Sequence, residues 1–218
     1  QPASGPQFRF RPTMAQFLEI HPRDPQPRLI AMVADTLRRG GVVVYPTDSI
    51  YAIGCRIGDK AAMERIRRIR QLDARHNFTL VCRDLSEIST YAKVSNPHYR
   101  LLKAQTPGPY TFIFKATKEV PRMLQNPKRK TIGIRIPDNA IALALLEELD
   151  APLSSSTLIL PDQEQPLSDA HEIREQLEHD VDLVIDGGHC GFEPTTVIDM
   201  TSGAPEVLRE GCGPVDML

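Results

Sequence analysis

Hydroxyl-bearing residues stand at the ends of several apolar runs of this chain, next to proline or glycine. Pro46-Thr47 follows the run 42–45, a Pro-Gly-Pro turn precedes the run 110–114, and Pro194-Thr195 precedes the run 196–200. Runs rich in β-branched and aromatic residues are typical of strands. A few convergent polar groups at such strand ends are typical of small-ligand sites. The sequence therefore predicts strand ends that meet around one small polar ligand.

Arginines also stand in strand-like segments, in Ile134-Arg135-Ile136-Pro137 and Leu208-Arg209-Glu210-Gly211. The chain contains no G-x-x-x-x-G-K-[ST], no G-x-G-x-x-G and no G-x-S-x-G motif, so the common nucleotide folds and serine-nucleophile chemistry have little support. Arginine forks and backbone N–H groups at turns bind carboxylates and phosphates. The residue set favours a reaction driven by positioning and charge stabilisation, without a protein nucleophile. No catalytic residue is assigned.

Composition is that of a globular protein without a basic excess. The 218 residues are 41% hydrophobic and 25% charged, with a formal net charge of −2. No apolar run approaches the roughly 18 residues that a membrane span requires. The cysteines are far apart and form no C-x-x-C pair. These features predict a cytoplasmic protein with reduced thiols, no membrane partner and no tightly bound metal. The cysteines are Cys55, Cys82, Cys190 and Cys212.

Helical and strand-like segments are mixed along the chain, with no repeat and no regular β-α-β alternation. This order predicts the α/β (α+β) class: a single domain with a large twisted mixed sheet flanked by helices. Residues 1–13 are turn-rich and apolar-poor, and we interpret them as a disordered extension or a remnant of cloning before a domain at 14–218. Predicted helices begin at Pro27, after Asp59 and at Asn96, and span 139–149 and 168–178; predicted strands span 42–45, 78–82, 110–115, 131–136, 152–159, 181–185, 196–200 and 207–209.

The motifs of this chain resemble, in their order, those of the YrdC/YciO family, and most closely those of its YciO-like branch. The resemblance extends over residues 40–213. It implies the YrdC/RibB-like fold with a concave, basic cavity. It also implies an activity of that family, the synthesis of threonylcarbamoyl-adenylate from threonine, bicarbonate and ATP with Mg²⁺ for tRNA modification. The matching motifs are Pro46-Thr47-Asp48-Ser49, Pro107-Gly108-Pro109-Tyr110-Thr111, Arg135-Ile136-Pro137, Thr195-Thr196-Val197-Ile198-Asp199 and Arg209-Glu210-Gly211.

The same resemblance implies two sets of site residues. One set would bind threonine or a similar small molecule, and the other would bind the nucleotide. The substrate-binding set is Thr47, Thr111, Arg135 and Thr195. The nucleotide-binding set is Arg70, Ser155, Thr157 and Arg209.

Two positions depart from the motifs of the synthases. Arg70 and Leu72 stand where a Lys-x-Arg pair is expected, so one cation is missing, although Arg75 or His76 could reach the same space. Thr157 replaces the asparagine of a Ser-x-Asn motif, which keeps a hydroxyl and loses an amide. Because both groups would serve the adenylate chemistry, the sequence leaves two functions open, with and without synthase activity.

The alternative to a synthase is an RNA-binding protein that makes no adenylate, with tRNA, rRNA or duplex RNA as its partner. The candidate contacts belong to the two segments that hold most of the clustered positive charge. They are Arg67, Arg68, Lys128 and Lys130. The simpler interpretation of these four residues is a solvated helix face and a charged loop. A third alternative is carbamoyl-adenylate handling, as in a related domain of hydrogenase maturation.

Overall fold

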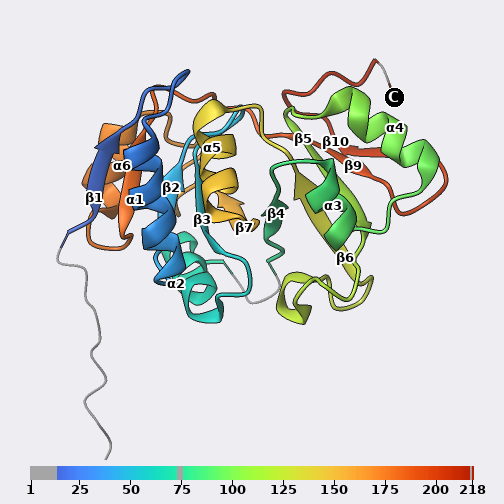
Figure 1. Ribbon diagram of the computed structural model, residues 1–218, viewed down its shortest axis with the longest axis horizontal. Coiled ribbons are helices and arrows are strands. Elements are labelled where there is room, and N and C mark those ends of the chain that lie inside the picture. Colours follow the sequence, from blue (N-terminus) through green and yellow to red (C-terminus); the bar gives the residue numbers. More distant parts are fainter. Residues whose placement is uncertain (1–13, 73–75, 217) are drawn as a thin grey trace, which may run out of the picture.

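A mixed sheet runs through the whole computed structural model, which describes residues 14–72, 76–216 and 218 (Figure 1). The predicted extension 1–13 and Arg75 lie outside the described residues. In the described part, the strands are β1 (Gln16–Glu19), β2 (Val43–Tyr45), β3 (Ala52–Arg56), β4 (Thr79–Val81), β5 (Tyr110–Lys115), β6 (Thr131–Arg135), β7 (Leu153–Thr157), β8 (Leu183–Asp186), β9 (Thr196–Asp199) and β10 (Glu206–Arg209).

The strand order is β1-β8-β2-β3-β7-β4-β6-β5-β9-β10. Parallel pairs join β1 to β8, β8 to β2, β4 to β6 and β5 to β9. The other neighbours are antiparallel. This arrangement confirms the predicted class, a large mixed sheet flanked by helices.

Helices cover both faces of the sheet. They are α1 (Pro27–Arg38), α2 (Lys60–Arg70), α3 (Leu85–Tyr91), α4 (Asn96–Gln105), the 3-10 turn η1 (Arg122–Leu124), α5 (Ala140–Leu149) and α6 (Ala170–Leu177). Most begin at a side chain that accepts a hydrogen bond from a free backbone N–H group, which stabilises a helix start. Asp59, predicted as a cap, accepts from the Ala62 N–H at 3.0 Å. Within the described residues, no helix is long and apolar enough to cross a membrane.

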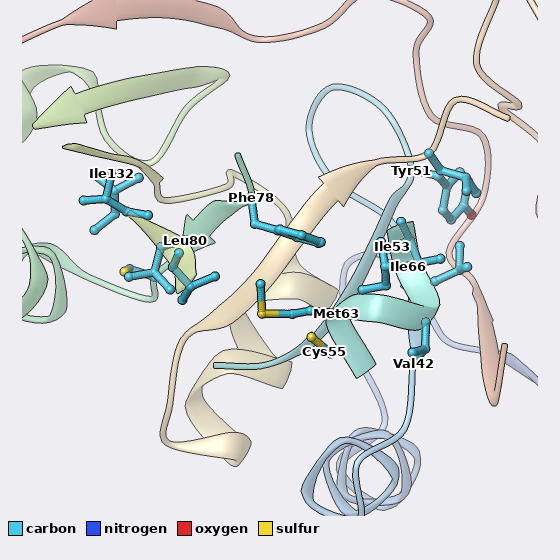
Figure 2. Packing of buried hydrophobic residues seen from close by; sticks show 14 of the residues in the cluster. Val42, Tyr51, Ile53, Cys55, Met63, Ile66, Phe78, Leu80 and Ile132 are labelled. Atoms are coloured by element: carbon cyan, nitrogen blue, oxygen red, sulfur yellow. The ribbon is translucent and has the colours of Figure 1, made fainter. Parts of the chain in front are cut away.

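Alternate residues of the central strands face two hydrophobic clusters, because successive strand side chains point to opposite faces. Val43 and Tyr45 belong to the cluster that contains the buried faces of α1 and α5. Val44 belongs to the other cluster, which contains those of α2 and α6. Figure 2 shows Met63 of α2 gathered with Cys55 of β3 in this second cluster. Figure 1 shows α1 and α5 together over the half of the sheet that holds β1, β2 and β3.

Four elements were not predicted: β1, α3, the 3-10 turn η1 and β3. The last of these is central, because it pairs with both β2 and β7. Its sequence is Ala-Ile-Gly-Cys-Arg, which has few of the β-branched and aromatic residues that signal a strand. Packing explains the glycine at position 54, since a Cβ atom there would lie 3.1 Å from Cε1 of Tyr45. The strand is therefore specified by its two neighbours rather than by its own propensity.

Candidate functional site

A cavity of about 210 Å³ opens on the face of the sheet that carries α1 and α5. Tyr45, Ala52 and Val81 line this cavity and also belong to the cluster under these two helices. Gly133 of β6 lies between Thr111 and Thr79, where a Cβ atom would be 3.4 Å from Cγ2 of Thr111. The missing side chain leaves room between these strands. The lining residues are Tyr45, Thr47, Ser49, Ile50, Ala52, His76, Asn77, Thr79, Val81, Thr111, Arg135, Pro137, Ser155, Ser156, Thr157, Thr195, Val197 and Arg209.

The turn after β2 forms one wall of the cavity. Thr47 Oγ1 donates to the Ile50 carbonyl at 2.6 Å and accepts from the Ser49 N–H at 3.0 Å. A hydroxyl that bonds to backbone groups a few residues away stabilises a local turn. Thr47 and Ser49 are both buried, and their hydroxyl oxygens lie 3.1 Å apart. The turn therefore presents two fixed hydroxyls side by side at the cavity wall.

Arg135, at the end of β6, is the most deeply buried cation of the cavity. Its Nη2 donates to the Asp48 carboxylate and, at 3.3 Å, to the Gly108 carbonyl. Its Nη1 donates to Ser49 Oγ at 3.3 Å. The Nε atom is buried and has no hydrogen-bond partner among the described residues. An unpartnered buried donor is costly, and this one belongs to a guanidinium that lines the cavity.

A second cation stands across the cavity, on β10. Arg209 Nε and Nη2 donate to the Thr195 carbonyl at 3.1 and 2.9 Å, and Nη2 also lies 3.3 Å from Thr195 Oγ1. Thr195 Oγ1 in turn lies 2.8 Å from Thr111 Oγ1 of β5. Gly211 allows the chain after β10 to come this close, since a Cβ atom there would be 2.2 Å from the Pro194 carbonyl. These contacts fix a pair of hydroxyls beside a guanidinium.

The third wall is β7, where three of four consecutive hydroxyl residues line the cavity. Ser155 Oγ lies 2.6 Å from Tyr45 Oη. Burial raises the pKa of Tyr45 to about 12, although the Ser155 hydrogen bond acts in the opposite direction. Tyr45 therefore stays neutral at physiological pH. The Thr157 hydroxyl completes the row at the cavity.

Arg70 acts through a neighbour instead of lining the cavity itself. Its Nη1 donates to Ser156 Oγ, and its Nε donates to the Ile159 carbonyl at 3.2 Å. His76 Nε2 lies 3.2 Å from the same Ser156 oxygen. Burial lowers the pKa of Arg70. The guanidinium thus positions Ser156 and adds positive charge behind the row of hydroxyls.

The structure brings the two predicted sets of site residues together. Seven of these eight residues line the cavity, and Arg70 contacts it through Ser156. Sequence reasoning missed Tyr45, Ser49 and Ser156, which belong to the same segments as predicted residues. The signal that could have found Tyr45 is strand alternation, which puts it on the face opposite Val44.

None of the four residues predicted to bind RNA lines the cavity. Arg67, expected on a solvated helix face, instead pairs with Glu64, and its Cζ lies 5.1 Å from the centre of the Phe78 ring. Arg65 of the same helix is half-buried and pairs with Asp182 at 2.7 Å. Arg68, Lys128 and Lys130 are exposed. Leu72, at the position of the missing cation, is half-buried and does not line the cavity.

Among the described residues, no carboxylate lines the cavity and no cluster of His, Cys, Asp or Glu could hold a metal ion. The lining contains two guanidiniums and a histidine. Such a lining suits carboxylate and phosphate groups.

Comparison with known proteins places the chain in a family. The Sua5/YciO/YrdC family model, described as "Telomere recombination", matches residues 35–211. The YciO protein of Escherichia coli is 60% identical over 93% of this chain and 98% of that protein. Its crystal structure superposes with a TM-score of 0.89.

A more distant relative is the threonylcarbamoyl-AMP synthase of Pyrococcus abyssi, which is 29% identical over 86% of this chain and 55% of the synthase. The chain thus spans about half the length of that enzyme. The structure of Pyrococcus abyssi Sua5 complexed with L-threonine has a TM-score of 0.82 and 26% identity, covering 89% of this chain and 57% of that chain. The mouse threonylcarbamoyl-AMP synthase is 32% identical over 84% of this chain and 67% of the synthase. The chain belongs to the Sua5/YciO/YrdC family.

Proposed function

We propose that the chain, acting in the cytoplasm, binds threonine or a similar hydroxy amino acid together with ATP and Mg²⁺ in the central cavity. We propose further that it forms threonylcarbamoyl-AMP there for tRNA modification. The observation that carries this proposal is the buried guanidinium of Arg135, with its unpartnered Nε, among the hydroxyls of Thr47, Thr111 and Thr195. A guanidinium suits a carboxylate, and hydroxyls suit the amine and hydroxyl of the substrate. The match to Sua5 complexed with L-threonine supports the same assignment.

The size of the cavity also supports a small amino acid as its ligand. At about 210 Å³ it is smaller than the roughly 300–1,000 Å³ of pockets that hold drug-sized molecules. The nucleotide would therefore lie towards the open side, along the Ser155–Thr157 row and Arg209. Arg70 would act as a positioning residue, because it holds Ser156 in this row.

The reaction proposed here needs no protein nucleophile. The threonine amine attacks the carbon of bicarbonate, a C–N bond forms, a C–O bond breaks and water leaves, which gives a carbamate. A carbamate oxygen then attacks the α-phosphorus of ATP. A new O–P bond forms, the bond from this phosphorus to the oxygen bridging to the β-phosphate breaks, and pyrophosphate leaves with that oxygen. Negative charge grows on the phosphate oxygens during this step. Cations held in place before the reaction stabilise such charge effectively.

The test is to incubate the purified chain with ATP, Mg²⁺, bicarbonate and L-threonine, and to measure pyrophosphate and the mass of the adenylate. L-Valine serves as a matched substrate control, because it has the shape of threonine without its hydroxyl. Pyrophosphate is expected with threonine and much less with valine. Arg209→Ala should reduce the signal strongly, whereas Arg100→Ala, on the exposed side of α4, should not. Absence of pyrophosphate and of calorimetric binding of both ligands would contradict the proposal.

A second candidate function is RNA binding without adenylate synthesis. The observation that favours it is a local charge excess: residues 115–130 contain six basic residues and one acid, a net charge of +5 in a chain whose total is −2. Exposed Lys128 and Lys130 belong to this segment, and Arg68 is exposed on α2. A gel-shift titration with tRNA and duplex RNA tests this function. Affinity should fall by an order of magnitude or more between roughly 50 and 200 mM salt, because phosphate contacts release counterions.

A further inference from the structure

A second hollow, of about 280 Å³, lies where β5 ends and β6 begins. It shares no lining residue with the central cavity. Its lining includes five cations that belong to three separate segments of the chain. They are Lys93, Lys115, Lys118, Arg129 and Lys130.

Hydrogen bonds, two of them between backbone groups, connect these three segments of the chain. The Lys93 N–H donates to the Lys115 carbonyl at 2.9 Å, and the Ala116 N–H donates to the Lys130 carbonyl at 3.0 Å. Lys115 Nζ donates to the Arg129 carbonyl at 2.9 Å. These bonds fix the backbone positions from which the five side chains extend, so the fold itself places the like charges close together.

The turn before β6 is also held in a defined shape. Asn126 Oδ1 accepts from the N–H groups of Lys128 and Arg129, each at 3.0 Å. Lys130 has φ of 54°, in the left-handed region that a lysine rarely adopts. The turn therefore keeps Arg129 and Lys130 next to the Lys115 end of β5.

These cations lack acidic partners of their own. Within the described part of the chain, none of the five is within 4.0 Å of a carboxylate oxygen. The pKa of the nearby Asp199 lies below its usual value. Burial raises this pKa, but hydrogen bonds from Thr201 and the charges of Arg129 and Lys115 lower it further than burial raises it. Asp199 and Glu119, the residue that follows Lys118, do not balance five cations. Like charges held together repel one another, and an anion that enters the hollow relieves this repulsion.

We infer that this hollow is a binding site for phosphate groups, separate from the central cavity. Lysine amines act as mobile point charges and an arginine adds a planar fork, a mixture that suits phosphate oxygens presented in more than one direction. All five side chains are exposed. An open, shallow arrangement of this kind fits successive phosphates of an RNA backbone, and a free polyphosphate presents the same chemistry. The inference bears on the second candidate function and is independent of adenylate synthesis.

The test compares two double charge reversals that change the net charge equally. Lys118→Glu with Arg129→Glu alters the hollow, while Arg23→Glu with Arg28→Glu alters exposed residues beside β1 and on α1, near the opposite end of the sheet. Binding of a 20-nucleotide duplex RNA is measured by gel shift, and binding of tripolyphosphate by calorimetry, both at low salt. ATP binding and adenylate formation are measured on the same preparations.

The hollow variant should lose at least tenfold in affinity for the probe that binds, and the control variant should lose much less. Two lost phosphate contacts should reduce the slope of log K against log salt by about 1.4–1.8. If RNA binds, with or without tripolyphosphate, the phosphate groups that the hollow recognises are those of a nucleic-acid backbone. If only tripolyphosphate binds, the phosphate site is supported and the RNA-binding function is contradicted. The inference is overturned if neither probe binds wild type, or if both variants lose affinity equally. Adenylate formation should be unchanged in the hollow variant, so its absence in wild type would count against the proposed synthase alone.

Discussion

Arg135 and Asp48 form a buried ion pair at the wall of the central cavity. The side chain of Arg135 is 7% exposed and that of Asp48 is 12% exposed. The second carboxylate oxygen of Asp48 accepts from the Asp138 N–H at 2.9 Å. One carboxylate thus joins the turn after β2 to the end of β6 and to the start of the α5 segment. It also holds the guanidinium in place, and Nε is left as the nitrogen of Arg135 without a hydrogen-bond partner among the described residues.

Asp48→Ala should destabilise the fold by about 3–5 kcal/mol, because it leaves a buried guanidinium without its counter-charge. Urea unfolding followed by far-UV circular dichroism measures this change. Glu175→Ala, at an exposed position of α6, is the matched control and should change stability by less than about 0.5 kcal/mol. A similar small effect at both positions would show that the ion pair contributes little.

Thr111→Val and Thr195→Val should each weaken ligand binding in the central cavity while preserving side-chain shape. Loss of one neutral hydrogen bond corresponds to about 0.5–1.5 kcal/mol, or roughly 2- to 13-fold in affinity. Because the two hydroxyls lie 2.8 Å apart and bond to each other, the double variant should lose less than the sum of the single losses. Calorimetry with L-threonine measures the effect, and Thr90→Val on exposed α3 should leave affinity unchanged.

Leu72→Arg combined with Thr157→Asn should raise adenylate synthesis, because it adds the cation and the amide that this chain lacks relative to the synthase motifs. Thr157 lines the cavity directly, so its replacement should affect binding of the nucleotide. Leu72 is half-buried, two residues after the end of α2, and an arginine there would add a cation near Arg70 in the chain. Pyrophosphate release is the measurement. A wild-type turnover already on the order of 1 s⁻¹, the low end for ordinary enzymes, would remove the reason for this prediction.

Stability should fall as pH rises above about 9–10. Burial raises the pKa of Tyr45 from 10.0 to about 12 and that of Cys55 from 9.0 to about 12. The unfolded chain then releases these protons at lower pH than the folded chain, so unfolding is favoured between the two pKa values and the loss is complete near pH 12. Urea midpoints at pH 8 and pH 10.5 measure this. Tyr45→Phe and Cys55→Ala should each make the decline shallower, and an equal decline in both variants and wild type would exclude these groups as its cause.

Sequence reasoning worked best where one local pattern decides the structure. The strand 110–115 was predicted with its observed bounds, and its residues alternate between buried and less buried positions. The cap of α2 at Asp59 follows from the same kind of local rule. β3 could not be found in this way, because its pairing with β2 and β7 specifies it more strongly than its own residues do.

The sequence allowed us to predict which residues belong to the candidate site, but not which residues they contact. Motif order identified Thr47, Arg135 and Thr195, but the Asp48 partner of Arg135 depends on two segments 87 positions apart in the chain. The half-buried state of Arg67 likewise depends on Phe78, which lies beyond the end of its own helix. Helical periodicity gives only the face on which a residue lies, and a partner from another element decides whether that face meets solvent.

The central cavity is assembled from strands that the chain supplies from Tyr45 near its beginning to Arg209 near its end. Any contiguous fragment that contains the Thr47 turn and both guanidiniums must span at least residues 47–209. Occupancy of the cavity is therefore linked to the cooperative unfolding of the entire sheet rather than to the opening of one loop. A ligand at 100 times its Kd would add about 2.7 kcal/mol to the free energy of unfolding, so a shift in melting temperature reports occupancy even when no reaction follows.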